Sequence, residues 1–545
     1  MQPKFIFVSG GVISGLGKGI TTASIGLLLK SAGIKVTPIK CDMYLNIDAG
    51  TMNPLEHGEI FVTDDGTEAD QDLGHYERFL DENLNKENYI TAGQIYQKVL
   101  EKERALEYQG KCIEAYIHIP EEIIKRFEKL ARKTEVVVVE FGGTVGEYQN
   151  IMFFEAARRM KIKYPQGVVF VHVGYLPIPS FLGEMKTKPI QQSIHDLNAL
   201  GIQPEIIVCR AEKEIDQRRK EKIALAAAVD LKDIFSSPDL FTVYQSPLVL
   251  NEQRLTERIL LKFGLKAKEK NLIEWRNLIT KVKHASQIVK IAIVGKYYTS
   301  GGFSLGDSYI SVIETIKHGC WANGVKPEII WFDSEKLETL NTQKLTEALK
   351  GMDGIIVPQG WGSRGVEGKI KAIQYARENK IPFLGLCFGM QMAVIEFGRN
   401  VVGLKKANSV EVNPKTPYPV IHIMPEQEKY LAKHQYGGTI RLGAWPCKIL
   451  PKSRLSQVYG RAFISERHRH RYEFNNKYRK RFEKAGMIIS GSSPDGKLVE
   501  AVEITNHPFF IGTQFHPEYK SRPLFPHPLF VNFIKAAKEK NEVNR

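Results

Sequence analysis

The sequence has no apolar run close to the ~20 residues that a membrane-spanning helix needs, and only 6 of its 545 residues are cysteine. The cysteines lie far apart with no CxxC pair, which argues against a structural zinc site and a disulfide-stapled scaffold. Residues 1–19 lack the charged lead and small-residue cleavage site of a signal peptide. We therefore expect a cytoplasmic protein with no membrane partner.

Low-complexity tracts and internal repeats are also missing, while 43% hydrophobic and 25% charged residues are typical of a globular chain. The length predicts two to four domains. The net charge of +15 is compatible with nucleic acid, an anionic membrane surface or nucleotides as the partner. Composition alone does not choose among them.

Short β-rich runs alternate with helical stretches in both halves of the chain, the pattern of a parallel sheet covered by helices. We expect an α/β fold of two domains in series, at residues 1–265 and 289–545, joined by a helical linker at 266–288. The expected buried strands lie at residues 5–8, 36–39, 136–139, 168–171 and 206–208 in the first domain, and at 289–295, 354–357 and 382–386 in the second.

A glycine-rich segment, SGGVISGLGKGIT at residues 9–21, follows the first strand directly and precedes a helix. This context favours a phosphate-binding loop, in which backbone N–H groups and Lys18 hold the anion. The strict P-loop pattern fails at Val12, where a glycine is expected, and at Gly19, where Ser or Thr is expected. A simple glycine-rich turn is the alternative interpretation.

Two acidic residues support a nucleotide site. Glu140 ends a valine run at the carboxyl edge of a predicted parallel strand, where ligands of α/β sheets bind. Asp72 is a candidate second oxygen ligand for magnesium. Taken alone, each would more often be a solvated carboxylate or a helix cap.

A cysteine stands in a different setting in the second half. The segment GLCFG at residues 385–389 predicts a nucleophile elbow, a tight strand-to-helix turn that presents Cys387 at a helix N-terminus. His516 and Glu518 follow a later strand and are the expected base and orienting acid. Gly360, at the end of another strand, is the expected oxyanion donor through its backbone N–H.

Together the two halves resemble the CTP synthase family, an amidoligase (synthetase) domain followed by a class I glutamine amidotransferase domain. The motifs that carry the resemblance are GTMNPLEHGE at 50–59, DLGHYER at 72–78, KTKP at 186–189, GGTIRLG at 437–443 and ERHRHRYE at 466–473. The resemblance implies that glutamine is hydrolysed at the cysteine. ATP then phosphorylates O4 of UTP, and ammonia displaces the phosphate to give CTP, the last step of de novo pyrimidine nucleotide synthesis.

The resemblance also assigns residues, by motif, to each ligand. For the synthetase it implies ATP contacts at Gly15, Leu16, Gly17, Lys18, Gly19, Ile20, Lys40 and Asp72, and Mg²⁺ at Asp72 and Glu140. UTP and CTP contacts are implied at Ser14, Glu147, Tyr148, Gln149, Lys186, Thr187, Lys188, Pro189, Ile190, Gln191 and Lys222. Glutamine contacts are implied at Gly360, Phe388, Gly389, Met390, Gln391, Glu411 and Arg471, an ammonia passage at Pro54 and His57, and a GTP response at Arg364, Thr439 and Arg441.

By the same resemblance the partners are ATP, UTP, glutamine, GTP as allosteric activator and CTP as inhibitor, with Mg²⁺ and no organic prosthetic group. A homotetramer, a dimer of dimers, is implied, and the family also forms filaments. One departure concerns feedback: Gly146 is followed by Glu-Tyr-Gln where the family usually has Asp-Ile-Glu. Loss of the second acid there leaves the strength of CTP inhibition open.

Two alternatives remain at this stage. Another amidoligase of the same plan, acting on a cobyrinic-acid-type carboxylate, would share both catalytic arrangements, although the motifs at 186–189 and 466–473 favour CTP synthase. A nucleic-acid-binding protein is suggested by the basic runs at 467–471 and 477–481. No helix-turn-helix, zinc finger or aromatic RNA-binding signature accompanies those runs, so we expect no nucleic-acid partner.

Overall fold

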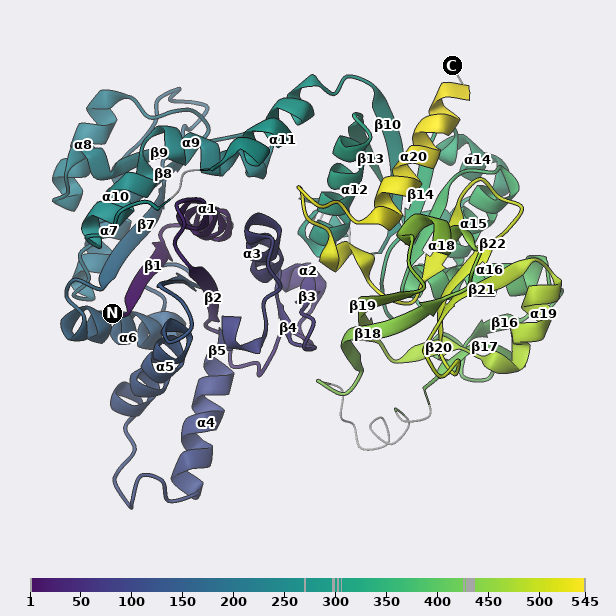
Figure 1. Ribbon diagram of the computed structural model, residues 1–545, viewed down its shortest axis with the longest axis horizontal. Coiled ribbons are helices and arrows are strands. Elements are labelled where there is room, and N and C mark those ends of the chain that lie inside the picture. The colour runs from purple at the N-terminus through teal and green to yellow at the C-terminus, as the bar shows by residue number, and fades with distance from the viewer. Residues whose placement is uncertain are drawn as a thin grey trace. The chain divides into compact units, whose positions relative to one another are not determined.

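The computed structural model describes residues 2–543 apart from 269–270, 297–298, 301–302, 305, 425–426 and 428–436. The chain forms two compact units (Figure 1). Unit 1 contains Met1–Ala49 and Asp72–Ile279, and unit 2 contains Gly50–Gln71 and Thr280–Arg545. A segment from the N-terminal half therefore packs with the C-terminal half. Among the described helices, none is both long and apolar enough to cross a membrane.

Unit 1 is built on a 7-stranded sheet in which all paired strands are parallel, in the order β5-β2-β6-β1-β7-β8-β9. The strands are β1 Lys4–Gly10, β2 Val36–Asp42, β5 Tyr89–Thr91, β6 Val136–Phe141, β7 Val168–Tyr175, β8 Ile206–Ala211 and β9 Ile234–Pro238. Runs of Val, Ile and Phe suit these strands because parallel sheets are buried on both faces. In β1, Phe5 and Phe7 join a core cluster that also contains Phe127 of α5.

Helices connect these strands. They are α1 Lys18–Ser31, α3 Asp72–Leu80, α4 Ala92–Arg104, α5 Ala115–Ala131, α6 Ile151–Lys163, α7 Lys188–Ala199, α8 Gln217–Ala227, α9 Ser246–Glu252, α10 Leu255–Lys262 and α11 Ile273–His284. Short 3₁₀ turns lie at η1 Lys86–Asn88, η2 Tyr148–Asn150, η3 Leu231–Asp233 and η4 Val243–Gln245. In α11, which lies entirely within the expected linker range of 266–288, the buried Trp275 donates its indole N–H to the Tyr244 carbonyl at 2.6 Å.

Unit 2 contains a 9-stranded mixed sheet in the order β13-β10-β14-β15-β23-β22-β21-β18-β19, parallel from β13 to β23 and antiparallel beyond. Its strands are β10 Ile288–Gly295, β13 Lys326–Asp333, β14 Gly354–Val357, β15 Phe383–Leu386, β18 Arg441–Ile449, β19 Phe463–His470, β21 Met487–Ser492, β22 Val499–Ile504 and β23 Phe510–Thr513. Smaller sheets pair β3 Ile60–Val62 with β4 Glu68–Asp70, β11 Thr299–Ser300 with β12 Phe303–Ser304, and β17 Tyr418–Ile423 with β16 Ala407–Ser409 and β20 Tyr472–Phe474.

The helices of unit 2 cover both faces of this sheet. They are α2 Pro54–His57, α12 Ile310–Ala322, α13 Ser334–Thr339, α14 Thr342–Leu349, α15 Val366–Glu378, α16 Phe388–Asn400, α18 Arg454–Tyr459, α19 Arg479–Lys484 and α20 Pro528–Val543, with 3₁₀ turns η5 Gly306–Tyr309, η6 Asn476–Tyr478 and η7 Pro517–Lys520. Alternate β10 side chains enter two cores: Ala292 and Val294 pack with α15 and α16, and Ile291 and Ile293 with α12 and α20.

The predicted α/β class and the predicted central strands are confirmed, since each expected run lies within or overlaps a strand of one of the two large sheets. The expected 382–386 strand begins one residue later, at Phe383, because Pro382 has no backbone N–H to donate. The helix expected directly after the Cys387 elbow begins at Phe388.

Candidate active sites

The glycine-rich segment of unit 1 joins β1 to α1 through backbone conformations that side chains disfavour. Gly15 and Gly17 have positive φ angles of 70° and 92°, and Val12, where a glycine was expected, also has a positive φ of 85°. The first turn of α1 carries no acidic residue, and no side chain caps it. Its backbone N–H groups are therefore suited to an anion.

Lys18 begins α1 and is nearly buried. Its Nζ donates a hydrogen bond to the Gly143 carbonyl oxygen at 2.7 Å. Burial lowers the pKa of Lys18, the neighbouring Lys40 lowers it further, and Glu140 opposes both. Burial removes the water that would otherwise solvate this ammonium group. A phosphate bound in the loop would supply a negatively charged partner in place of that water.

The glycine at position 19 has a steric cause. A Cβ atom there would lie 1.9 Å from the Asp72 Oδ1 atom, which leaves no space for the Ser or Thr of the strict P-loop. Glycine in place of Ser or Thr at position 19 thus allows α1 and α3 to lie close together at the loop.

Acidic and basic groups gather at the carboxyl ends of β2 and β6. The Lys40 ammonium forms ion pairs with Asp72 and with Glu140, the latter at 3.0 Å. The Tyr76 hydroxyl donates to Glu140. Burial and the charge of Asp72 raise the pKa of Glu140 to about 7, although Lys40 opposes the shift. Two carboxylates that meet at one ammonium group are an oxygen donor set that fits Mg²⁺.

The residues expected to contact UTP occupy two places in unit 1. Thr187 is the N-cap of α7, and Lys188, Pro189, Ile190 and Gln191 form its first turn. Lys186 precedes the helix and pairs with Glu184 at 2.7 Å. Lys222 lies exposed on α8, which packs against α7.

The altered Glu-Tyr-Gln segment lies after β6. Glu147 accepts hydrogen bonds from the backbone N–H and hydroxyl of Thr144 at 2.6 and 2.8 Å. Tyr148 is 93% exposed, and Gln149 and Ser14 are exposed as well. In the described part of the chain, no hydrogen bond or ion pair joins Glu147, Tyr148 or Gln149 to the α7 residues expected to bind UTP.

The predicted elbow is present in unit 2. Cys387 lies between β15 and α16 with φ 51° and ψ −101°, a conformation unfavourable for a side chain. Glycine is required on both sides: a Cβ at Gly389 would lie 1.9 Å from the Val357 carbonyl oxygen, and one at Gly385 would lie 2.8 Å from the backbone of Gly389. Cys387 is only 4% exposed, so the elbow does not present it openly at the sheet edge.

His516 and Glu518 lie together beside the cysteine. The His516 Nδ1 atom is 2.7 Å from Glu518 Oε1, and both side chains are buried. Burial lowers the pKa of His516, but the charges of Glu518 and Cys387 outweigh this effect and raise it to about 10. Glu518 therefore fixes the ring and stabilises imidazolium.

Other groups near the thiol come from strands that the motif did not include. The Gln514 side-chain amide donates to the Cys387 Sγ atom at 3.6 Å, and the thiol donates to the Arg469 carbonyl at 3.7 Å. The Gln391 amide donates to the Tyr472 carbonyl at 2.9 Å and to Gln514 at 3.2 Å. These contacts fix the side chain of Gln391 beside the thiol.

Two buried lysines hold the loop that carries Gly360. The Lys296 ammonium donates to the carbonyl oxygens of Trp361, Gly362 and Arg364, and that of Lys369 donates to Pro358 at 3.0 Å. Burial lowers the pKa of Lys296 to about 8. Burial also lowers the pKa of Lys369 well below its ordinary value. The loop carbonyls are thereby held by charged or polar donors, and the loop keeps one conformation.

A cavity of about 310 Å³ in unit 2 is lined by two of the expected glutamine contacts, Glu411 and Arg471. Its lining is formed by Gly50, Met52, Pro54, Ile60, Trp361, Glu411, Ile440, Arg469, Arg471 and Tyr472. Glu411 accepts the Gly362 N–H at 2.7 Å, and burial raises its pKa. One acid and one guanidinium in a single cavity match the amino and carboxylate groups of an amino acid.

Of the residues expected to respond to GTP, Thr439 contacts a residue that lines this cavity, and the other two pair with acidic side chains elsewhere in unit 2. The Thr439 hydroxyl accepts a hydrogen bond from Arg471 at 3.0 Å, so it lies against an expected glutamine contact. Arg441 pairs with the buried Glu500 at 2.8 Å. Arg364 pairs with Glu335 at 3.0 Å.

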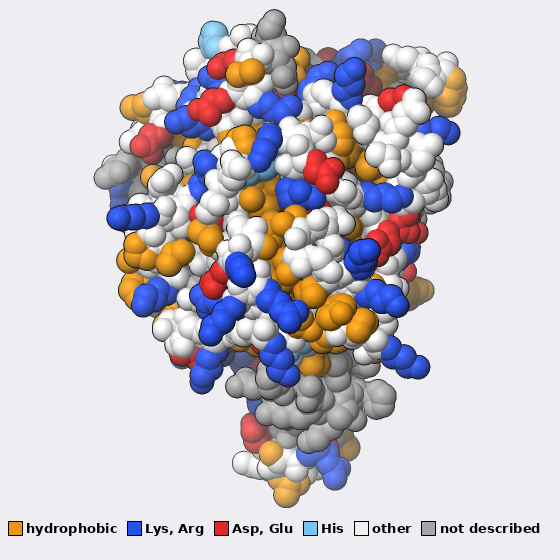
Figure 2. Space-filling model, turned by 90° about the vertical axis from the view of Figure 1, so that its right-hand side faces the viewer, with side chains coloured by type: hydrophobic (Ala, Val, Ile, Leu, Met, Phe, Trp, Pro, Cys, Tyr) orange, Lys and Arg blue, Asp and Glu red, His pale blue; other side chains and the backbone are white. Residues whose placement is uncertain are grey.

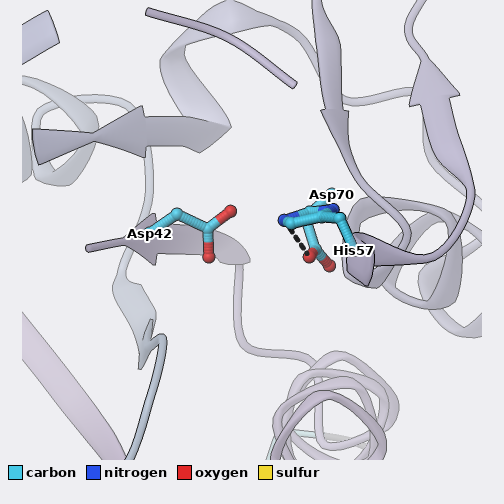
Figure 3. Close-up of side chains that lie close together, drawn as sticks. All are labelled: Asp42, His57 and Asp70. Carbon is cyan, nitrogen blue, oxygen red and sulfur yellow. Dashed lines mark ion pairs between the residues drawn. The ribbon is translucent and has the colours of Figure 1, made fainter. Parts of the chain in front are cut away.

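His57 and Asp70 lie side by side within unit 2. The His57 Nε2 atom is 3.5 Å from Asp70 Oδ2, and Figure 3 draws this contact as a dashed line. Pro54, the other expected passage residue, lies one helical turn before His57 on α2 and lines the same cavity as Glu411 and Arg471.

The basic run at residues 467–471 is not a surface feature. Arg467 is fully buried and pairs with Asp64 at 2.6 Å, while Arg469 pairs with Glu68 at 2.7 Å. His468 and His470, which alternate with these arginines in β19, are buried as well. On the face drawn in Figure 2, basic side chains are scattered among acidic and apolar ones instead of forming one patch.

The sequence reasoning missed several residues of these sites. Tyr76, Arg469 and Gln514 form hydrogen bonds with expected site residues, and the ammonium groups of Lys296 and Lys369 lie 4.6 and 5.3 Å from the ring centre of Phe388. Two had a usable signal: Gln514 lies two residues before His516, and Arg469 alternates with histidines in a strand. A buried lysine gives no such signal because lysine is usually solvated.

Fold and sites define a class: a ligase in which a phosphate-binding α/β unit and a cysteine-dependent glutamine amidotransferase share one chain. The family model described as CTP synthase N-terminus matches residues 4–265, and that of class-I glutamine amidotransferase matches residues 304–536. The chain belongs to the CTP synthase family.

Curated relatives of this name match over nearly the whole length. CTP synthase of Caldanaerobacter subterraneus is 50% identical over 98% of both chains, and that of Thermococcus gammatolerans is 48% identical over 98% of this chain and 99% of the relative. Among solved structures, the glutaminase domain of a Trypanosoma brucei CTPS with bound acivicin is 41% identical, covers 46% of this chain and 94% of that one, and has a TM-score of 0.42.

Proposed function

We propose that the two sites divide the reaction of the CTP synthase family between them. The chain is a glutamine-hydrolysing ligase that aminates UTP to CTP with ATP. One observation carries the assignment of sites: a Cys387 elbow with a His516–Glu518 pair at 2.7 Å occurs in the same chain as a phosphate loop flanked by Lys18, Lys40 and two carboxylates.

In the glutaminase site, the cavity carboxylate Glu411 binds the substrate ammonium and Arg471 its carboxylate. Cys387 attacks the side-chain amide carbon, and the Gly360 N–H stabilises the oxyanion that forms. Protonated His516 gives its proton to the departing ammonia, and then takes a proton from water as the thioester is hydrolysed. Phe388, Gly389 and Met390 supply the first turn of α16, and Gln391 contacts the substrate beside the thiol.

In the synthetase site, the loop from Gly15 to Ile20 binds the ATP phosphates through its backbone, and Lys18 turns from the Gly143 carbonyl toward them. Asp72 and Glu140 would hold Mg²⁺, which neutralises phosphate charge when it is bound. Lys40 pairs with both carboxylates and remains beside the transferred phosphoryl group. Phosphorylation of the UTP O4 turns a poor leaving group into phosphate, which ammonia can displace.

The pyrimidine nucleotide contacts are proposed at the start of α7 and nearby. Lys186, Lys188 and Lys222 meet the triphosphate, and Gln191 lies in the first turn with them. Glu147 is already engaged by Thr144 and Tyr148 is exposed, so CTP feedback through this segment is proposed to be weaker than is usual in the family.

Further properties extend the proposal to regulation. Pro54 and His57 line the ammonia passage, and GTP acts through Arg364, Thr439 and Arg441, because Thr439 contacts the glutamine-binding Arg471. CTP inhibits, and the enzyme is a homotetramer. Cytoplasmic location and filament formation stay predictions.

The assay is direct. Purified protein is incubated with ATP, Mg²⁺, UTP and glutamine, and the change from uracil to cytosine absorbance is followed, with a parallel reaction containing an ammonium salt in place of glutamine. We expect CTP in both. Absence of CTP together with turnover of a carboxylic acid substrate would assign the chain to another amidoligase reaction.

A further inference from the structure

A buried histidine lies between the phosphate loop and α7 in unit 1. His172 is in the middle of β7 and is 0% exposed. Its Nδ1 atom is 3.0 Å from the Ser9 hydroxyl oxygen, and its Nε2 atom is 2.8 Å from that of Ser193. Ser9 is the residue before the paired glycines of the loop, and Ser193 is on α7.

The hydrogen-bond geometry fixes the direction of this chain. The Ser193 hydroxyl donates to the Ile190 carbonyl at 3.0 Å, so its oxygen accepts from the His172 Nε2–H group. Ser9 lies 3.5 Å from the Val171 carbonyl, too long for a good O–H···O bond. Its proton therefore goes to Nδ1, and donation runs from Ser9 through His172 and Ser193 to the first turn of α7.

The surrounding backbone leaves little freedom for these elements to move independently. A Cβ at Gly11 would lie 2.1 Å from the Ser193 Cβ, and one at Gly174 would lie 2.1 Å from the Ile190 Cγ1. The Gly11 N–H donates to the Val173 carbonyl at 3.1 Å. Loop, strand and helix thus pack without intervening side chains, and the three-residue chain is their polar connection.

His172 is suited to this task because it stays neutral. Burial, with a smaller effect from the nearby Lys18 charge, lowers its pKa to about 3. One ring nitrogen therefore accepts and the other donates at every pH at which the protein is active. A cation at this position would have to donate from both nitrogens, and the Ser9 bond would be lost.

We propose that His172 is a positioning residue that couples the phosphate loop to α7 through Ser9 and Ser193, so that ATP and UTP are held in register for phosphoryl transfer. The inference rests on the proposed assignment of ATP to the loop and UTP to α7. His172 contacts neither nucleotide, and its effect appears in kcat more than in the KM of either.

The test is a double-mutant cycle on ammonia-dependent CTP formation. Ser9→Ala and Ser193→Ala should each lower kcat about threefold to tenfold, with KM for ATP and UTP changed less than about twofold. The double variant should be no slower than the slower single, since either change breaks the same chain. In a His172→Phe background the serine changes should have no further effect, and His172→Gln, which keeps an acceptor and a donor, should recover most of the rate.

Glutaminase turnover at Cys387 provides the folding control and should be unchanged in all variants. Multiplicative losses for the two serine changes, or an unchanged kcat in His172→Phe, would overturn the inference. Lys18→Ala separates this failure from that of the site assignment. If Lys18→Ala leaves kcat and the KM for ATP unchanged, the loop is not the ATP site and the inference fails with it; if Lys18→Ala removes activity while the serines act independently, only the inference fails.

Discussion

At the residue scale, the charge of His516 is decided by three competing influences. Burial opposes the imidazolium, while Glu518 at 2.7 Å and Cys387 favour it strongly enough to raise the pKa to about 10. The ordinary histidine value is 6.5. Folding therefore increases the proton affinity of this side chain.

That shift has a definite sign in stability. A raised pKa stabilises the folded protein fully below about pH 6.5, and the contribution is lost as the pH rises through about 10. We expect Glu518→Gln to lower the melting temperature most below pH 6.5, with the difference from wild type shrinking toward pH 10. Melting curves of both proteins from pH 6 to 10 measure this. A difference that grows with pH would contradict the assigned charge.

Glu140 and Tyr76 make a matched pair for the synthetase site. Glu140→Gln removes a proposed metal ligand and should reduce both glutamine-dependent and ammonia-dependent CTP formation by more than ~100-fold, whereas Tyr76→Phe removes only the hydrogen bond to that ligand and should cost roughly 10-fold to 100-fold. Rates at increasing Mg²⁺ test the pair. Tyr76→Phe should be partly rescued by high Mg²⁺ and Glu140→Gln should not; equal behaviour of the two would argue against Glu140 as the ligand.

At the scale of elements, the close approach of α1 and α3 explains why the phosphate loop departs from the strict P-loop pattern at position 19. Gly19 is where the α1 backbone meets Asp72 of α3, and a Cβ added at this glycine would lie only 1.9 Å from the carboxylate. A Ser or Thr side chain at position 19 and the Asp72 carboxylate would occupy the same space. In this chain the carboxylate is present and position 19 is glycine.

Restoring the hydroxyl should therefore be harmful. Gly19→Ser must displace Asp72, and a displacement of about 1 Å at a reacting site can cost roughly 100-fold in rate. We expect CTP formation from either nitrogen source to fall by that order, while glutaminase turnover is retained. Gly26→Ser, on the same helix but against the flexible end of Leu80, is the control and should be much less affected. Normal activity in Gly19→Ser would mean that the loop has a different conformation.

The parts of the fold and of the sites that could be predicted from the sequence are those whose sequence pattern is local. The elbow at residues 385–389 and the glycine loop were predictable because glycines mark backbone that other residues disfavour. The strands β5 and β9 of unit 1 were not: one is short, and in the other, IFSSP, two serines and a proline follow a single Ile-Phe pair. Lys296 and Lys369 were missed since their burial depends on distant loop carbonyls.

At the scale of the whole molecule, one segment crosses the expected domain order. Residues 50–71 lie within the range that matches the CTP synthase N-terminus, yet they pack in unit 2. Asp64 and Glu68 of this segment pair with Arg467 and Arg469, and its first residues line the glutamine cavity. No local sequence pattern indicates that residues 50–71 pack with the C-terminal half of the chain. A division of the chain into consecutive domain ranges therefore did not predict this packing.

The net charge of +15 can be interpreted differently once the positions of the basic residues are known. The most conspicuous basic run is buried against acidic partners, and other cations, such as Lys18 and Lys188, lie in the first turns of α1 and α7. Polyanionic nucleotides are partners of the right chemistry for the latter group. The excess that remains has no assigned partner in the two sites.

The measurement that tests the central claim most directly compares nitrogen sources in Cys387→Ala. This variant removes the nucleophile and leaves the synthetase residues intact, so CTP formation from glutamine should be abolished while formation from ammonia stays close to the wild-type rate. Loss of the ammonia-dependent activity in a folded Cys387→Ala protein, or survival of the glutamine-dependent activity, would contradict the division of the reaction between two sites.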